Sequence, residues 1–371
     1  MLYYLPLEQY PERYTSLMSC RGGWTESNFS RLGIDYTRID GKRLGNGTIG
    51  KGVVLDAFGR NYYAQSQTMR VVELLREGKI VDGDVVYTED FWHSGIDSLF
   101  YVRQLTGIKF RVGCFLHAQS VDSSDFCHAM RRWMRPIERG YGKGYDYIFV
   151  CSPILKRLCV KAGVGTERNV HVVGLPYNSA RLVEQSEAMG VRRPARKERS
   201  VIFSSRFDDE KDPMFFLDLV ESLPEVRFRL VNPRKGRPIS SNREVVSRLE
   251  TVLSRKGSNL ELVDTSDKAR YYEALSRAKV QFNCAIQDWV SWTLLEAVTF
   301  GCLPLYPRWK DFPSELHNDG RFLYRRKDLG DAKRKLLALL DTDASSVDLE
   351  HVVKRHDASW ERFAKIMKLT K

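Results

Sequence analysis

The chain has 371 residues, of which 43 % are apolar and 11 % aromatic, and it carries 59 Lys and Arg against 47 Asp and Glu. This length is enough for two domains of ordinary size, and the absence of any run of about 18 apolar residues predicts no membrane-spanning helix. The net charge of +12 favours a polyanionic partner, such as nucleic acid, an anionic membrane face or a phosphate-rich ligand. Surplus surface Lys and Arg would give the same composition.

The N-terminus and the cysteines indicate a cytoplasmic protein. Residues 1–14 lack the basic and apolar regions of a signal peptide, and we interpret residues 2–7 as a first strand. The seven cysteines are an odd number without a Cys-x2-Cys pair. We therefore expect reduced thiols that pack as small apolar residues, and neither disulfides nor a zinc site.

The first half of the chain alternates between predicted strands and helices, which predicts a parallel, doubly wound sheet. Ligands of such sheets bind beyond the carboxyl ends of the strands. Glu8, Arg13 and Tyr14 follow the first strand and His117 ends the third, so all four are candidate ligand contacts. Glu8 and Arg13 would also suit a surface pair, and a lone His is often structural. The strands are predicted at residues 2–7, 84–90, 110–122, 146–152 and 170–178, and the helices at 61–77, 91–107 and 153–163.

Two further motifs resemble ligand sites. Residues 41–52 nearly spell a Walker A loop, but Gly52 replaces the required Ser or Thr and no apolar strand leads into it. We predict a flexible loop or hairpin there, one that could touch an acceptor. Asp341 and Asp343 resemble a metal-binding Asp-x-Asp pair, but they follow a predicted helix, so we predict a turn and no metal site.

A charged connector separates this half from a second series of strands and helices. Residues 192–199 carry five Lys and Arg with one Pro, which is typical of a domain boundary. Such a linker is usually solvated, and it would also suit a polyanion. The second half has predicted strands near residue 200 and at 226–232, 260–264 and 280–285, with helices at 269–279 and 356–369. We place the domains at residues 1–190 and 191–355, with a terminal helix at 356–371.

Two carboxylates bracket the start of a predicted helix in the second half. Asp288 lies on the loop after a strand, and Glu296 lies one turn inside the helix, which begins near Ser291 or Thr293. A ligand at this helix start would meet both carboxylates, free backbone N–H groups and the positive helix end. A capping box from Thr293 to Glu296 and an Asx turn at Asp288 are the alternative, purely structural interpretations.

The spacing Asp288-x7-Glu296, followed by Ala297, Gly301 and Pro304, resembles the Glu-x7-Glu signature of retaining glycosyltransferases of the two-Rossmann (GT-B) fold. In that family the first acid faces the donor sugar and the second holds the ribose of the nucleotide. Here the first acid is one methylene shorter, and the loop reads WVSWT where the family usually has glycines.

Other segments resemble the same family. Arg206 and Lys211 match, in identity and spacing, a pair that neutralises the donor pyrophosphate, although Ser205 stands where Gly is common. An exposed pair beside acidic residues is the structural alternative. Residues 145–176 resemble the strand–helix–strand that ends the first domain. His117 matches a family His that contacts donor or acceptor.

The resemblance implies an α/β protein with two Rossmann-like, doubly wound domains facing across a cleft. The first would bind the acceptor and the second the nucleotide-sugar donor, and the terminal helix would pack back on the first. It also implies a nucleoside-diphosphate sugar, expected to be a UDP-sugar, as co-substrate, with no metal or other cofactor. Ser291, Trp292 and Thr293 would contact this donor beside the two acids, and Asp288 and His117 would serve catalysis.

The opening PLEQYPERYTS, with LDAFGR, AQSVDSSDF and the DWVSWTLLEA loop, is similar to glycosyltransferases encoded by large bacteriophages. That similarity implies transfer to hydroxymethylated bases of double-stranded DNA in the host cytoplasm, with Arg131 and Arg132 joining Glu8, Arg13 and Tyr14 at the acceptor. One alternative is a lipid-linked or surface polysaccharide at an anionic membrane face, although no basic amphipathic stretch with exposed aromatics is evident. Another is an inactive nucleic-acid-binding protein that keeps the fold. The sequence does not predict an oligomeric state.

Overall fold

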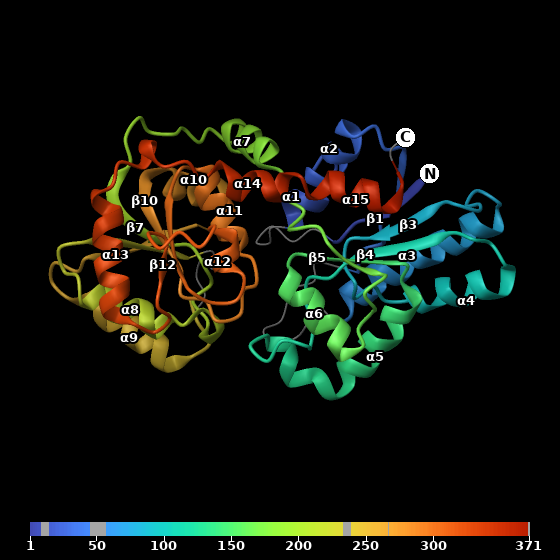
Figure 1. The fold of residues 1–371 in the computed structure, drawn as a ribbon, viewed down its shortest axis with the longest axis horizontal. Coiled ribbons are helices and arrows are strands. Elements are labelled where there is room, and N and C mark those ends of the chain that lie inside the picture. Colours follow the sequence, from blue (N-terminus) through green and yellow to red (C-terminus); the bar gives the residue numbers. More distant parts are fainter. Residues whose placement is uncertain (9–14, 45–56, 233–238, 266, 370–371) are drawn as a thin grey trace. The chain divides into compact units, whose positions relative to one another are not determined.

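The computed structural model describes residues 1–8, 15–44, 57–232, 239–265 and 267–369. The chain divides into two compact units, one of Met1–Tyr177 with His356–Lys371 and one of Asn178–Arg355. Figure 1 shows that each unit is built on its own sheet with helices on both sides. The Walker-like stretch at 41–52 lies largely outside the described residues.

The first unit contains a sheet in the order β2-β1-β3-β4-β5-β6, and every neighbouring pair is parallel. Since parallel strands need crossover connections, helices alternate with the strands and cover both faces. The strands are β1 (Leu2–Leu5), β2 (Tyr36–Arg38), β3 (Val85–Thr88), β4 (Arg111–Phe115), β5 (Tyr147–Val150) and β6 (Val170–Val172). The helices are α1 (Thr15–Ser19), α2 (Trp24–Arg31), α3 (Gly59–Arg76), α4 (Ile96–Thr106), the 3-10 turn η1 (Phe126–Met130), α5 (Arg131–Gly144) and α6 (Pro153–Ala162).

The second unit repeats the scheme, with a parallel sheet in the order β12-β11-β10-β7-β8-β9. Its strands are β7 (Glu198–Phe203), β8 (Arg227–Asn232), β9 (Leu260–Asp264), β10 (Ala278–Phe282), β11 (Leu303–Pro307) and β12 (Leu323–Tyr324). Its helices are α7 (Ser179–Ala188), η2 (Asp209–Lys211), α8 (Pro213–Glu221), α9 (Arg243–Ser254), α10 (Lys268–Arg277), α11 (Trp292–Thr299), α12 (Phe312–Glu315), α13 (Leu329–Asp341) and η3 (Ala344–Ser346).

Local sequence signals set several element ends. Ser152 caps α6, because its Oγ accepts a hydrogen bond from the Leu155 N–H at 3.1 Å, and Pro153 fills the first turn. Gly163 ends the same helix at a φ of 74°. Asp343 accepts a hydrogen bond from the Ser345 N–H at 3.0 Å and so caps η3, which agrees with the turn predicted there. The seven cysteines are free, and all but Cys20 are buried.

The predicted boundary after residue 190 lies later than the boundary between the units. Helix α7, which begins at Ser179, belongs to the second unit, because it packs on α10 and α11 and buries Leu182 completely. The connector is therefore the segment after α7, inside the second unit.

The single helix predicted for residues 356–369 is two helices, α14 (Glu350–Asp357) and α15 (Ser359–Met367), so this prediction was wrong in extent. Val352 on α14 and Phe363 on α15 are both buried. The division between the two units falls within α14, at Arg355 and His356. The break at Ala358 lets α15 turn its own apolar face to the core of the first unit.

Aromatic residues of α15 complete that core. The Phe363 ring lies 4.7 Å from Tyr87, 4.9 Å from Phe149 and 6.0 Å from Phe29, measured between ring centroids. The Trp360 ring lies 5.6 Å from Phe29 at 89°. Such edge-to-face and tilted pairs add to the hydrophobic gain from burial. Residues from the far end of the chain thus hold the first sheet together.

Phe363→Ala should destabilise the first unit by about 3–5 kcal/mol, because it opens a cavity among three aromatic rings. Urea unfolding followed by tryptophan fluorescence would measure this. Tyr101→Ala is a control, since this α4 side chain is 67 % exposed and its removal should cost no more than about 0.5 kcal/mol. Equal midpoints for the two variants would show that α15 adds nothing to the core.

Candidate functional site

The site predicted in the second unit lies where β7 and β10 end. These strands are parallel neighbours, so the loops that follow Phe203 and Phe282 start at the same edge of the sheet. Side chains join the two segments, since Gln281 near the end of β10 donates to the Ser204 hydroxyl at 3.1 Å and Asn283 of the loop to the Ser205 hydroxyl at 3.4 Å.

Lys211 and Asp288, predicted from separate motifs, form an ion pair in which the ammonium donates to the Asp288 carboxylate. Their side chains are 9 % and 19 % exposed, so the pair is largely removed from water. The backbone fixes it: the Ile286 N–H donates to the Glu210 carbonyl at 3.1 Å, and Cys284 contacts the Lys211 carbonyl at 3.2 Å. A cation and an acid are therefore held side by side at the carboxyl edge.

Arg206 comes from the same loop as Lys211. Its guanidinium donates to Glu210 at 2.5 Å and remains 51 % exposed. An exposed pair of this kind contributes only about 0–1 kcal/mol, so Arg206 can exchange Glu210 for a ligand phosphate at little cost. The loop thus supplies two cations.

Glu296 lies inside α11 and is 4 % exposed. One carboxylate oxygen accepts a hydrogen bond from the Tyr271 hydroxyl of α10 at 2.6 Å. Burial raises the pKa of Glu296, against the smaller opposing effects of Lys268 and of this hydrogen bond. No side chain caps the start of α11, so the structure does not contain the alternative capping box from Thr293 to Glu296.

The start of α11 is polar. Ser291 precedes the helix, and its hydroxyl is 2.8 Å from that of Thr293, which in turn lies 3.4 Å from the Tyr306 hydroxyl. Trp292 is half-buried at the first helical position. The first N–H groups of a helix are good partners for an anion.

The sequence did not identify the residues that support this loop. The Lys310 ammonium lies 4.2 Å above the Trp289 ring and donates to the Gln287 carbonyl at 2.5 Å. Trp309 donates to the Ile286 carbonyl at 3.0 Å, and the Arg326 guanidinium lies 4.1 Å over its ring. These contacts stiffen a loop that has tryptophans where the resembling family has glycines.

The sequence did not identify Tyr271 either, because no local pattern marks a tyrosine that hydrogen-bonds a carboxylate on another helix.

In the first unit, β3 lies between β1 and β4, and the residues that follow it contact His117, predicted for catalysis, and, through Arg60, Glu8, predicted for the acceptor. Glu8 is buried, and its carboxylate is 3.4 Å from the buried Arg60, which also lies 3.7 Å from Asp90. The His117 Nε2 is 3.0 Å from the carbonyl of Glu89, the residue before Asp90. The alternative surface pair of Glu8 with Arg13 involves a residue that the structure does not describe. Arg13 and Tyr14 lie outside the described residues.

Glu89 organises the chain that follows β1. Its fully buried carboxylate accepts hydrogen bonds from the hydroxyls of Tyr4, Ser19 and Thr25 and from the Leu7 N–H at 3.0 Å. Burial raises the pKa of Glu89, while these donors act in the opposite direction. Four donors on one carboxylate join Tyr4 of β1 and Leu7 to Ser19 of α1 and Thr25 of α2.

Arg131 and Arg132 lie exposed on α5. Arg131 donates to the His128 carbonyl at 3.1 Å. Both are free to meet solvent or a partner from the helix that follows the His117 loop.

Two basic residues of the connector, Lys197 and Arg193, pack against the ends of helices in the second unit. The half-buried Lys197 ammonium, its pKa lowered by desolvation, donates to the carbonyls of Leu275, Ser276 and Phe300 at 3.2, 2.6 and 2.5 Å. These carbonyls end α10 and α11, where a cation is favoured. Arg193 lies 5.3 Å over the Phe300 ring.

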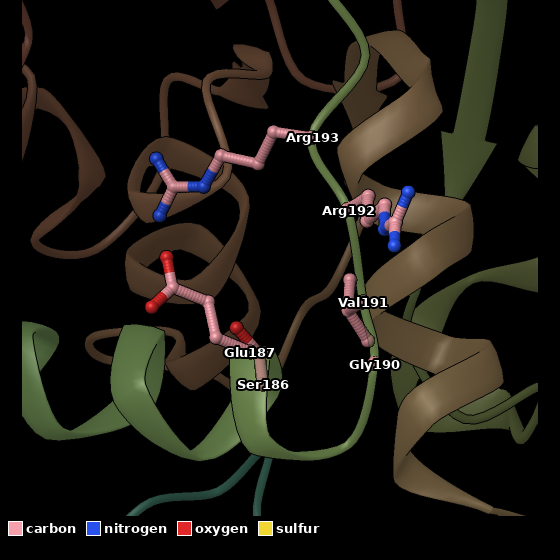
Figure 2. A pocket seen from close by; sticks show the side chains of 6 residues that line it. All are labelled: Ser186, Glu187, Gly190, Val191, Arg192 and Arg193. Atoms are coloured by element: carbon pink, nitrogen blue, oxygen red, sulfur yellow. The ribbon is translucent and has the colours of Figure 1, made fainter.

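Two shallow hollows in the second unit are lined by this connector. Figure 2 shows the first, of about 440 Å³, with Arg193 and Glu187 on one side of the chain after α7 and Arg192 on the other. The second, of about 350 Å³, has four cations at the amino ends of β7 and β10. Neither contains a predicted donor residue. We take the carboxyl edge as the site, because ligands of doubly wound sheets bind there. The second hollow is lined by Arg196, Lys197, Arg199, Lys279, Leu340 and Asp341.

The described part of the chain contains neither a candidate membrane-spanning helix nor a candidate metal cluster. Every helix there is too short or too polar to span a bilayer. No three His, Cys, Asp or Glu side chains there gather closely enough to hold a metal ion.

Together the two parallel sheets and the carboxyl-edge loops define a GT-B architecture. The sequence matches no protein-family model and no curated protein. Solved structures do match over nearly the whole chain. A glycosyltransferase from Rickettsia africae ESF-5 has 12 % identity and a TM-score of 0.59, covering 99 % of this chain and 97 % of its own.

Two named synthases match equally well. Sucrose-phosphate synthase from Thermosynechococcus elongatus has 15 % identity and a TM-score of 0.60, with coverage of 99 % and 94 %. A UDP-forming trehalose-phosphate synthase from Burkholderia xenovorans, in complex with glucose-6-phosphate, has 14 % identity and a TM-score of 0.63, with coverage of 99 % and 100 %. At these identities the likeness establishes the fold.

Glu296 should make stability depend on pH in a definite direction. Its pKa is raised in the folded state. Its contribution to the free energy of unfolding is therefore complete at pH values below the ordinary pKa of Glu, and it is lost as the pH rises through the folded-state pKa. Glu296→Gln should remove that slope, as measured by urea unfolding across this window. Glu350→Gln, an exposed control, should behave as wild type. If Glu296→Gln leaves the pH dependence of the free energy of unfolding unchanged, folding does not raise the pKa of Glu296.

Proposed function

We propose that the protein is a retaining glycosyltransferase that uses a nucleoside-diphosphate sugar, with a UDP-sugar as the expected donor. The observation that carries the proposal is the Lys211–Asp288 pair at the carboxyl edge of the second sheet, on the same edge as Arg206 and Glu296. The match to solved glycosyltransferases of this fold supports it.

In the proposed reaction the bond between the anomeric carbon and the diphosphate oxygen breaks, and the anomeric carbon bonds to an acceptor hydroxyl on the same face of the sugar. The hydroxyl proton passes to the leaving diphosphate. Arg206 and Lys211 stabilise the charge that grows on this diphosphate. No strong protein base is needed, and neither is a metal ion, because the two cations neutralise the leaving group.

We assign the remaining residues by their chemistry. Glu296, oriented by Tyr271 through one oxygen, accepts hydrogen bonds from the ribose through the other. Asp288 faces the sugar, and the polar start of α11, at Ser291, Trp292 and Thr293, contacts the donor. His117, held by the Glu89 carbonyl, serves the reacting sugar or the acceptor.

We propose a hydroxymethylated pyrimidine of double-stranded DNA as the acceptor, in the cytoplasm of the host cell. The sequence similarity to bacteriophage glycosyltransferases and the net charge of +12 support this choice. The target nucleotide would leave the duplex, at a cost of a few kcal/mol, which phosphate contacts offset. Glu8, Arg131 and Arg132, with Arg13 and Tyr14 beyond the described residues, are the acceptor contacts.

A second candidate acceptor, a lipid-linked or surface polysaccharide, gains support from α5. Contrary to the expectation from sequence, this basic helix does expose apolar side chains, with Trp133 51 % and Ile137 38 % exposed. The third alternative, an inactive nucleic-acid-binding protein, would bind DNA without consuming a nucleotide-sugar.

Lys211→Met should weaken UDP binding by about 1.5–3 kcal/mol, or roughly ten- to hundredfold, because the variant cannot form a charge-assisted hydrogen bond to the diphosphate. Isothermal titration calorimetry would measure this. Since Lys211→Met leaves Asp288 without its partner, the double variant Lys211→Met/Asp288→Asn separates instability from weakened binding. Arg321→Ala, at the amino end of β12 and 63 % exposed, is the charge control. Unchanged affinity in the Lys211 variants would remove the diphosphate assignment.

Incubation with hydroxymethylated DNA and a panel of nucleotide-sugars, followed by mass spectrometry of the nucleosides, tests the acceptor. We expect one hexose or pentose on the hydroxymethylated base, and none with Asp288→Asn at comparable donor affinity. Donor hydrolysis without sugar on DNA would favour the polysaccharide acceptor. DNA binding without hydrolysis would favour the inactive protein.

A further inference from the structure

Helix α5 carries an exposed surface that the donor chemistry does not use. Its sequence, RRWMRPIERGYGKG, contains five cations and a single acid. That acid, Glu138, is fully buried and lies 3.4 Å from Arg135. Among the described residues, no ion pair involves Arg131, Arg132, Arg139 or Lys143.

Helical spacing arranges this surface in two neighbouring stripes. Arg132, Arg139 and Lys143 lie on one side, while Trp133, Ile137 and Gly140 lie on the other. A Cβ added at Gly140 would meet nothing within 4 Å, so the surface beside Trp133 is open. A row of cations thus runs beside a flat aromatic stripe.

The Trp133 ring is fixed although half of it faces solvent. It lies 6.0 Å from the ring of Trp92 at 67°, and Trp92 is itself 9 % exposed and packs on Tyr141. An indole held in this way loses little conformational entropy when it stacks on a ligand.

Helix α5 is also joined to the loop that carries His117. The Glu138 carboxylate accepts hydrogen bonds from the Ser120 N–H at 2.7 Å and the Ser120 hydroxyl at 2.5 Å. Arg135 donates to the Ser120 carbonyl at 2.7 Å. These contacts tie α5 to the loop that carries His117.

We infer that this α5 surface docks nucleic acid, with Arg132, Arg139 and Lys143 on the phosphates and Trp133 stacked on an unpaired base. The inference rests on the proposed DNA acceptor and adds how it is held. Stacking on an aromatic is sequence-tolerant and works beside a positively charged groove. It suits an unpaired base of a single strand or of an opened duplex.

Charge complementarity favours nucleic acid over a membrane here. A helix that lies in a bilayer interface needs a broad apolar face turned outward. On α5 the outward apolar side chains are Trp133 and Ile137, and the four cations without an ion pair outnumber them among the described residues. A phosphodiester backbone, with one charge per nucleotide, matches the row of cations.

Fluorescence anisotropy with a fluorescein-labelled single strand and its duplex, over a salt series, tests the cations. Arg132→Ala/Lys143→Ala should reduce the log–log salt slope by about 0.7 on the single strand, and by about 0.9 on the duplex, for each phosphate no longer neutralised. The control variant Arg168→Ala/Lys256→Ala removes the same charge from exposed positions elsewhere. Its log–log salt slope should fall less than that of the α5 variant. Equal reductions in the two double variants would overturn the assignment to α5.

The same assay tests the stacking. Trp133→Ala should weaken single-strand binding roughly five- to 150-fold, and Trp133→Phe, which keeps a ring over Trp92, should retain most of the affinity. Tyr101→Ala, another exposed aromatic, should change little. If Trp133→Ala and Tyr101→Ala behave alike, no base stacks there.

Two further measurements separate the possible failures. If phosphatidylserine vesicles bind the wild type but not Trp133→Ala, while DNA binding is unchanged in that variant, the surface is a membrane site and the inference is wrong. UDP calorimetry in the same preparations reports on the transferase. Absence of donor binding would overturn the proposed function without altering the result on α5.

Discussion

The candidate site depends on one constraint, the parallel alignment of β10 between β7 and β11. Parallel strands all leave the sheet at the same edge, so the loop after β7 and the loop after β10 must meet, although Lys211 and Asp288 are far apart in sequence. The sheet thereby converts two unrelated stretches into an ion pair. An antiparallel arrangement of the same strands would place the cation and the acid at opposite edges.

The carboxylates of Asp288, Glu296 and Glu89 are largely withdrawn from water, and each has a specific partner. Asp288 has Lys211, Glu296 has the Tyr271 hydroxyl, and Glu89 has four donors. Burying a charge without such partners would cost several kcal/mol. The compensation fixes one geometry, which the proposed transfer reaction would require because donors and charges must be in place before the bond breaks. The same buried groups are costly to replace one at a time.

The positive charge of the chain divides into two kinds. Part of it is structural, because Lys197 ends α10 and α11 and Lys279 donates to the Leu340 carbonyl at the end of α13, at 2.7 Å. These cations offset the negative ends of helices and are not available to a partner. On α5, Arg139 meets the end of α6, Arg131 donates to the His128 carbonyl and Arg135 to the Ser120 carbonyl. Arg132 and Lys143 have no such contact among the described residues. Net charge alone did not separate these kinds.

The sequence by itself determined the α/β alternation, the cap at Ser152, the cation pair Arg206-x4-Lys211 and the acid spacing Asp288-x7-Glu296, because each depends on residues close together in the chain. Only the tertiary structure decided that Tyr271 orients Glu296, that Lys310 supports the Trp289 loop, and that α7 belongs to the second unit. It also decided that the terminal helix breaks at Ala358. These features join residues through packing between elements, and local periodicity carries no information about which element a side chain will meet.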